Sequence, residues 1–134
     1  MPTFSYRKLV RDNIPSFHDE AGHTTDVTVL RGQALSAALV TKLHEEADEV
    51  SAALQPEEFL EELADVQQII DDLCALHGVS EETLRGVVTK KAAKKGGFQA
   101  GYYIETVTMP RDDDEWVAYC RKSPDKYPEI DPSL

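Results

Sequence analysis

Hydrophobic residues recur every three or four positions through the middle of the chain, which predicts two long amphipathic helices. The first spans about 33–54 and the second runs from 56 to about 76, where Gly78 is the expected C-terminal cap. Gln55-Pro56 breaks the pattern, and Pro56 suits the first turn of the second helix. A break this short predicts that the two helices pack antiparallel as a hairpin. Their apolar stripes are Leu35, Leu39, Leu43, Ala47, Val50 and Leu54, then Phe59, Leu63, Val66, Ile70 and Leu73.

The segments on either side have shorter helical patterns. Residues up to about 21 are expected to be helical or irregular, with Pro15 interrupting the pattern. Ser80 opens a third helix, acidic residues occupy its first turn, and Gly96-Gly97 ends it. The expected buried side of this helix consists of Leu84, Val87, Val88 and Ala92.

Two further segments have the composition of short strands. Residues 26–30 alternate polar and apolar, and residues 102–109 are rich in β-branched and aromatic side chains. We therefore predict a mainly α fold, an antiparallel helical bundle with one or two short β-strands.

The sequence after Pro110 changes character, because it is acidic and interrupted by prolines. We predict a domain at 1–109 and an acidic C-terminal extension at 110–134, an extended arm packed through Trp116 and Tyr119. The prolines that punctuate the extension are Pro124, Pro128 and Pro132.

Composition limits the possible partners. The 134 residues are 41% hydrophobic and carry a formal net charge of −11, which fits a globular protein and argues against general binding to nucleic acid or to anionic membranes. A small anionic substrate is compatible with this charge only if metal ions or a local basic patch meet it.

Features that the sequence lacks indicate where the protein is located and whether its cysteines are oxidised. There is no N-terminal apolar region of the secretory type and no apolar run near the length of a membrane span. Cys74 and Cys120 do not form a Cys-x-x-Cys pattern. We expect a cytoplasmic protein with reduced thiols.

Four carboxylates in the two long helices are the main candidates for chemistry. Glu46 and Glu49 are spaced i, i+3, and so are Glu62 and Asp65, which places each pair on one helix face. The antiparallel hairpin brings the two pairs level. Four converging carboxylates repel one another unless a cation binds, and hard oxygen ligands favour Mg²⁺ or Mn²⁺. The alternative is that both pairs lie on solvated faces of acidic helices.

Other metals fit this residue set less well. Zinc prefers histidine or cysteine ligands, and a di-iron bundle uses Glu-x-x-His on two helices, a spacing found here only from Glu20 to His23, outside the long helices. His44 is expected to be a surface or packing residue. Glu45 lies about 100° around the helix from Glu46. It either joins a second metal, holds a water or is simply solvated.

Two basic clusters are candidates for phosphate contact. Lys91, Lys94 and Lys95 share one helix face before Gly96-Gly97-Phe98, where lysines also complement the helix dipole. Arg7, Lys8 and Arg11 form the second cluster, for which spacing alone favours a solvated face.

Four segments together resemble the all-α nucleoside triphosphate pyrophosphohydrolase superfamily, which includes MazG-like proteins and phosphoribosyl-ATP pyrophosphohydrolase. The acidic segments 45–49 and 62–65 are similar to its Glu-Glu-x-x-Glu and Glu-x-x-Asp pattern. The opening segment 6–15 resembles one MazG-like branch, and 94–98 is similar to a basic-Gly-Gly-Phe segment of the phosphoribosyl-ATP enzymes. The resemblance covers roughly residues 6–109.

The resemblance implies a bundle completed by assembly into a homodimer or homotetramer, and Mg²⁺-dependent cleavage of an α–β phosphoanhydride, with Mn²⁺ as a possible substitute. The substrate is a nucleoside triphosphate or a phosphoribosyl-ATP-like nucleotide. Glu46, Glu49, Glu62 and Asp65 then bind the metal, and Glu45 assists a second ion or positions the attacking water. The implied substrate contacts are Lys8, Arg11, Lys91, Lys94 and Lys95.

Two other functions are compatible with the same residues. One is a non-catalytic helical interaction module whose acidic faces are merely soluble. The other is a family member that binds a nucleotide without cleaving it. Pyrophosphate release from a nucleotide panel separates an enzyme from both.

Overall fold

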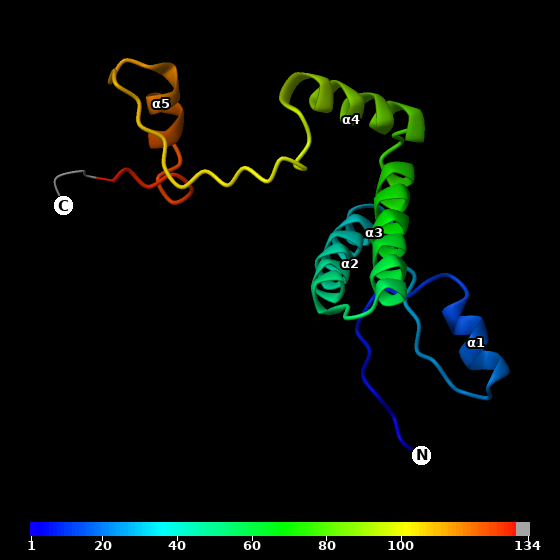
Figure 1. The fold of residues 1–134 in the computed structure, drawn as a ribbon. Coiled ribbons are helices and arrows are strands. Elements are labelled where there is room, and N and C mark those ends of the chain that lie inside the picture. Colours follow the sequence, from blue (N-terminus) through cyan, green and yellow to red (C-terminus); the bar gives the residue numbers. More distant parts are fainter. Residues whose placement is uncertain (131–134) are drawn as a thin grey trace. The chain divides into compact units, whose positions relative to one another are not determined.

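The computed structural model describes residues 1–130 and is mainly helical, as predicted (Figure 1). It divides into two units, Met1–Gly96 and a second that begins at Gly97. Each unit is described separately below. The helices are α1 (Ile14–Glu20), α2 (Gly32–Ala52), α3 (Pro56–Leu76), α4 (Glu81–Lys95) and α5 (Glu115–Arg121).

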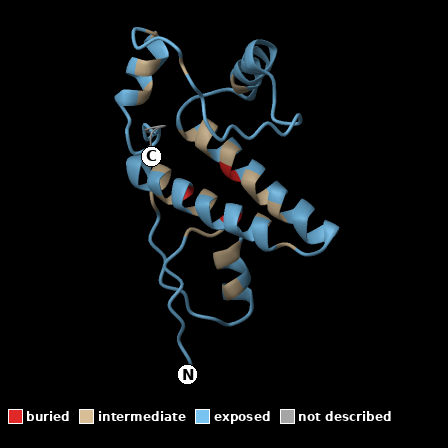
Figure 2. Cartoon of the chain, turned by 60° about the vertical axis from the view of Figure 1, so that its left-hand side comes forward, coloured by how far each residue is buried: buried red, intermediate tan, exposed pale blue. Residues whose placement is uncertain are grey.

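The first unit is built on a hairpin of α2 and α3, which lie side by side and are joined by residues 53–55 (Figures 1 and 2). Pro56 occupies the first turn of α3, as expected from its missing N–H. The buried hydrophobic side chains are Leu39 of α2 and Ile69 of α3. The predicted hairpin is therefore confirmed. Leu54 is an exception to the predicted stripe, because it lies in the connecting loop and is exposed. Ala47, Phe59 and Leu63 are in the predicted stripes but are also exposed.

The end of α3 is also as expected. Gly78 follows the helix with φ 71°, a left-handed conformation that glycine adopts without a Cβ penalty. Its N–H donates to the carbonyl of Ala75 at 3.2 Å, and the N–H of Val79 donates to that of Cys74 at 2.8 Å. This pair of hydrogen bonds is a Schellman motif, which satisfies two carbonyls at the helix end.

Helix α4 begins and ends where the sequence predicted. The Ser80 hydroxyl accepts a hydrogen bond from the Thr83 N–H at 3.0 Å, and Gly96 follows the last turn. Its predicted buried side is wrong in part: Leu84 is half-buried, but Val87, Val88 and Ala92 are exposed. Within the described residues of this unit, no element covers that side of the helix.

Neither predicted strand is present in residues 1–130. Residues 26–30 and 102–109 are in neither a helix nor a strand, so the expected one or two short β-strands are a wrong prediction. A strand exists only through backbone hydrogen bonds to a neighbour. β-Propensity alone could not supply that neighbour.

Pro15 has a different role from the one predicted. It lies in the first turn of α1, where a missing N–H breaks no intrahelical hydrogen bond. It therefore helps to start α1 instead of interrupting a helical pattern.

The second unit contains α5, where an extended arm was expected. Asp114 caps this helix by accepting a hydrogen bond from the Trp116 N–H at 2.9 Å. Trp116 and Tyr119 pack edge to face with ring centroids 5.5 Å apart. The expected extended arm is therefore interrupted by a helix, and Trp116 and Tyr119 pack on each other while more than half exposed. Pro132 lies outside the described residues.

Two further findings concern membrane-spanning helices and cysteines. No helix in residues 1–130 is both long and apolar enough to cross a membrane. Cys74 and Cys120 are half-buried free thiols.

Candidate metal site

Three of the predicted carboxylates converge between α2 and α3. Glu46 comes from α2, and Glu62 and Asp65 come from α3. One carboxylate oxygen of each lies within 4.8 Å of the other two. The hairpin thus brings together side chains that the spacing alone could only place on two separate helices.

The position of this acidic cluster follows from the apolar contact of the hairpin. Glu46 lies seven residues after Leu39, and Glu62 lies seven before Ile69, which is about two helical turns in each case. Both acids are therefore on the faces that α2 and α3 present to each other. Glu46 is 8% exposed and is the buried charged residue among those described.

The pKa of Glu62 is shifted by the negative charge of the cluster. Its pKa is raised above the ordinary 4.5, first by a hydrogen bond with the Glu46 side chain, then by partial desolvation and the charges of Glu46, Asp65 and Glu49. Each effect favours the protonated form of Glu62. A raised pKa here indicates that negative charge in the cluster is not fully compensated.

The other two predicted acids lie beside the cluster. The negative charge of Glu49 contributes to the raised pKa of Glu62, although Glu49 is not part of the set of three within 4.8 Å. Glu45 forms an ion pair at 3.5 Å with Lys42. Neither contact assigns Glu45 or Glu49 a role.

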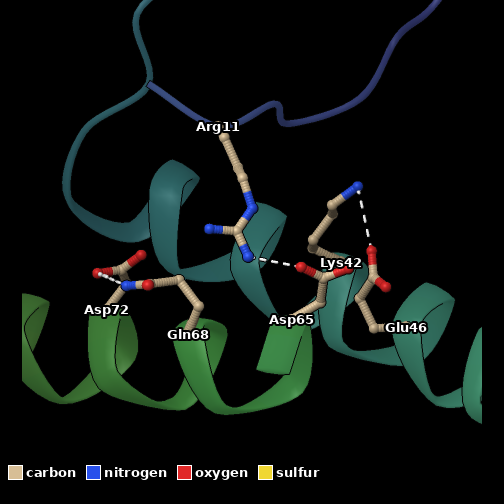
Figure 3. Close-up of polar contacts among 6 residues, drawn as sticks. All are labelled: Arg11, Lys42, Glu46, Asp65, Gln68 and Asp72. Atoms are coloured by element: carbon tan, nitrogen blue, oxygen red, sulfur yellow. Dashed lines mark hydrogen bonds and ion pairs between the residues drawn. The ribbon is translucent and has the colours of Figure 1, made fainter. Parts of the chain in front are cut away.

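Lys42 is a site residue that the sequence reasoning missed. Its ammonium lies 3.5 Å from a carboxylate oxygen of Glu46 (Figure 3). It also lies 3.5 Å from a carboxylate oxygen of Glu45. The signal was present, because Lys42 precedes these acids by three and four residues on one helix. Lys42 therefore neutralises part of the charge on buried Glu46.

Arg11 reaches the cluster from the N-terminal segment. Its guanidinium Nη2 donates to Asp65 Oδ1 at 2.5 Å, although the two residues are 54 positions apart (Figure 3). The side chains of Arg11 and Asp65 are 58% and 34% exposed, so the pair contributes only about 0.2–1 kcal/mol. Arg11 was predicted as a substrate contact, and here it contacts a predicted metal ligand instead.

The remaining predicted substrate contacts lie elsewhere. The Lys8 ammonium lies 5.6 Å from the centre of the Tyr6 ring. Lys91, Lys94 and Lys95 are exposed on α4, and within residues 1–130 none of them forms an ion pair with the cluster.

An open depression at the other end of the hairpin is separate from the acidic cluster. Gly32 and Leu76 are among the residues that line it, and the Ser36 hydroxyl and His77 Nε2 are hydrogen-bonded there at 3.0 Å. It contains no acidic side chain. It offers no ligand set for a hard cation.

The donor chemistry of the cluster fits a divalent cation. Among three ligands of an octahedral Mg²⁺ ion at most one pair is opposite, about 4.2 Å apart, and adjacent ligands lie about 3.0 Å apart. The three oxygens lie within 4.8 Å of one another, so they would have to draw closer to bind one ion. The cluster is therefore a set of three oxygen donors that could hold a metal ion.

Comparison with known proteins adds no assignment. No protein-family model matches the chain, and no curated protein or solved structure is significantly similar to it.

Proposed function

We propose that the chain is a Mg²⁺-dependent nucleotide pyrophosphohydrolase that converts a nucleoside triphosphate or a phosphoribosyl-ATP-like nucleotide to a monophosphate and pyrophosphate. The observation that carries the proposal is the convergence of Glu46, Glu62 and Asp65 from two helices. The resemblance of segments 6–15, 45–49, 62–65 and 94–98 to the MazG-like superfamily supplies the reaction.

The reaction is the attack of water on the α-phosphorus, with cleavage of its bond to the bridging oxygen. A bound divalent cation would polarise the phosphoryl oxygens and lower the pKa of water. Glu46, Glu62 and Asp65 would hold that cation, with Glu49 beside them. Glu45, one residue from Glu46, would either help hold a second cation or orient the attacking water.

The oxygen-only donor set favours Mg²⁺ in this proposal, and Mn²⁺ is the natural substitute. Both are hard cations that bind carboxylates in near-octahedral arrangements. The cation would also reduce the electrostatic repulsion between a polyphosphate and a chain of net charge −11.

Substitution of the ligands tests the assignment. Asp65→Asn and Glu46→Gln should each lower turnover at least about 100-fold, because each removes a charge that orients the cation against the developing phosphoryl charge. Pyrophosphate release is measured on a panel of NTPs, dNTPs and phosphoribosyl-ATP, with and without Mg²⁺.

Asp48→Asn is the matched control for this test. Asp48 is exposed and lies two residues, or about 200°, from Glu46 on α2, so its loss should leave turnover near wild type. Equal turnover by the Asp65 and Asp48 variants would refute the site. An absence of turnover on every nucleotide would refute the enzyme class.

Assembly is part of the proposal, because the resemblance implies a homodimer or homotetramer. Apolar side chains on α3 support it: Phe59 and Leu63, one turn apart, are 46% and 41% exposed. Helix α2 covers the Ile69 side of α3 but leaves this neighbouring strip open. A second copy of the chain would bury it.

The same exposed strip also supports the second candidate, a non-catalytic helical interaction module. The two candidates differ in what stabilises the chain. An enzyme of the proposed class should gain thermal stability from Mg²⁺ or Mn²⁺ with a nucleotide by mass action, whereas the module should show no shift.

A further inference from the structure

The side chain of Arg11 connects the N-terminal segment to the acidic cluster. Arg11 precedes α1 in sequence, yet its guanidinium donates to Asp65 on α3 (Figure 3). Leu9 and Val10, just before it, are only half-buried. The Arg11–Asp65 ion pair therefore links the segment to the hairpin.

Two cations contact the cluster in different ways. Lys42 lies on α2 itself, four residues before Glu46, so its backbone keeps a fixed place beside the cluster even when its side chain changes rotamer. Arg11 lies outside the hairpin on an irregular segment and is more than half exposed. Of the two, only Arg11 is attached to a part of the chain that can move away.

Arg11 and a divalent cation would share the carboxylate of Asp65. The guanidinium donates to Asp65 Oδ1, and the Asp65 carboxylate is one of the three donors that converge. A guanidinium and a metal ion held on one carboxylate at contact distance would repel each other. A cation on Glu46, Glu62 and Asp65 would therefore weaken the contact between Arg11 and Asp65.

We propose that Arg11 is a latch on the metal site: it occupies Asp65 in the metal-free chain and is released when a divalent cation binds. The inference rests on the proposed function, because it assumes that the cluster binds a cation. The latch is weak, since the ion pair is exposed, and it lowers the affinity for the cation by a factor of about 1.5 to 5.

Release gives Arg11 a second use. A freed guanidinium offers five N–H donors in a planar fork that matches phosphate oxygens. Arg11 remains joined to α2 through residues 12–31, so the freed guanidinium stays on the same chain as the site. The cation thus prepares the site for an anionic substrate by releasing Arg11 from Asp65.

Binding of Mn²⁺ alone to the full chain tests the latch, with no nucleotide present. Free Mn²⁺ is followed by electron paramagnetic resonance for wild type, Arg11→Gln and Arg7→Gln. Arg7 is exposed, belongs to the same segment, and has no ion pair with the cluster among the described residues. Arg11→Gln should bind Mn²⁺ about 1.5- to 5-fold more tightly than wild type, and Arg7→Gln should stay close to wild type.

Hydrogen exchange of the Ile14 amide, which donates to the Arg11 carbonyl at 3.0 Å, gives a readout that affinity alone does not. Mn²⁺ should increase exchange at this amide in the wild type, because release of the Arg11 side chain loosens the segment that holds this hydrogen bond. In Arg11→Gln the exchange should already be high and should not respond to Mn²⁺. A wild-type segment that is unchanged or more protected with Mn²⁺ would overturn the latch.

The outcomes separate the latch from the site. If all three proteins bind Mn²⁺ with equal affinity, the latch is refuted and the proposed metal site stands. If none of them binds Mn²⁺, both the latch and the proposed function are refuted.

Discussion

At the residue scale, the carboxylates of the acidic cluster repel one another, and Lys42 and Arg11 partly offset this repulsion. Glu46 is nearly buried beside Lys42, and Asp65 is partly shielded by Arg11. Glu62 has no ion pair in the described residues, and its pKa is the one raised by its acidic neighbours. The metal-free chain therefore tolerates the cluster at neutral pH at some cost in stability.

Stability of the metal-free protein should depend on the protonation of Glu62. Because the pKa of Glu62 is raised above 4.5 on folding, the folded chain binds this proton more tightly than the unfolded chain. The resulting stabilisation is present below about pH 4.5 and is lost as the pH rises through the raised value. Glu62→Gln should therefore have a higher urea midpoint than wild type at pH 7 in EDTA.

The difference between the two proteins isolates Glu62 from other titrating groups. It should shrink as the pH falls towards 4.5, and Glu61→Gln, next to it on α3, should show no such pH-dependent gain. A wild type that is as stable as Glu62→Gln at every pH would contradict the raised pKa.

At the element scale, caps and loop lengths set the helix bounds. Ser80 and Gly96 bound α4, and the Schellman motif at Gly78 ends α3. These features act through hydrogen bonds within a few residues, so they are readable in the sequence. Helix α5 has the same kind of signal, Asp114 as cap with Glu115 in the first turn, but its seven residues are too few for a clear apolar period.

The Ser80 cap has a measurable contribution. Ser80→Ala should destabilise the first unit by about 1 kcal/mol, because the Thr83 N–H loses its partner at the start of α4. Urea denaturation measures the change, and hydrogen exchange should place it in the first turn of α4. Thr89→Ala deletes a hydroxyl in the exposed interior of the same helix and is the control. Equal effects of the two substitutions would show that Ser80 has no special role.

At the scale of the whole molecule, each unit has apolar side chains that are exposed to solvent. In the first unit the exposed strip on α3 includes Phe59 and Leu63, and in the second unit Trp116 and Tyr119 pack on each other while more than half exposed. Exposed apolar patches of this kind mark interaction surfaces. The proposed assembly would cover the strip on α3.

Assembly can be tested by placing a charge in that strip. Leu63→Glu should shift the chain towards a monomer in sedimentation velocity, because a buried unpaired carboxylate opposes association. The helical content should be unchanged, since Leu63 is already 41% exposed. Ala75→Glu adds the same charge at another exposed position of α3 and should not alter assembly. A wild type that sediments as a monomer at all concentrations would contradict the proposed assembly.

The sequence was least informative about contacts between distant segments. It located α2, α3 and α4 within about two residues, because apolar periodicity and capping are local properties. It misjudged residues 26–30 and 102–109, because a strand requires a hydrogen-bonding neighbour that composition does not specify. It also overestimated how far α4 is covered.

The site shows the same division. The sequence by itself determined that pairs of carboxylates share a helix face and, through the short break at Pro56, that their two helices form a hairpin. Only the tertiary structure decided that Glu46, Glu62 and Asp65 form the close set, since that depends on how the Leu39 and Ile69 faces pack. Only it placed Arg11 on Asp65, because no local rule relates side chains 54 residues apart. The sequence sets the spacing of the carboxylates along each helix, whereas the packing of α2 on α3 decides which carboxylates converge.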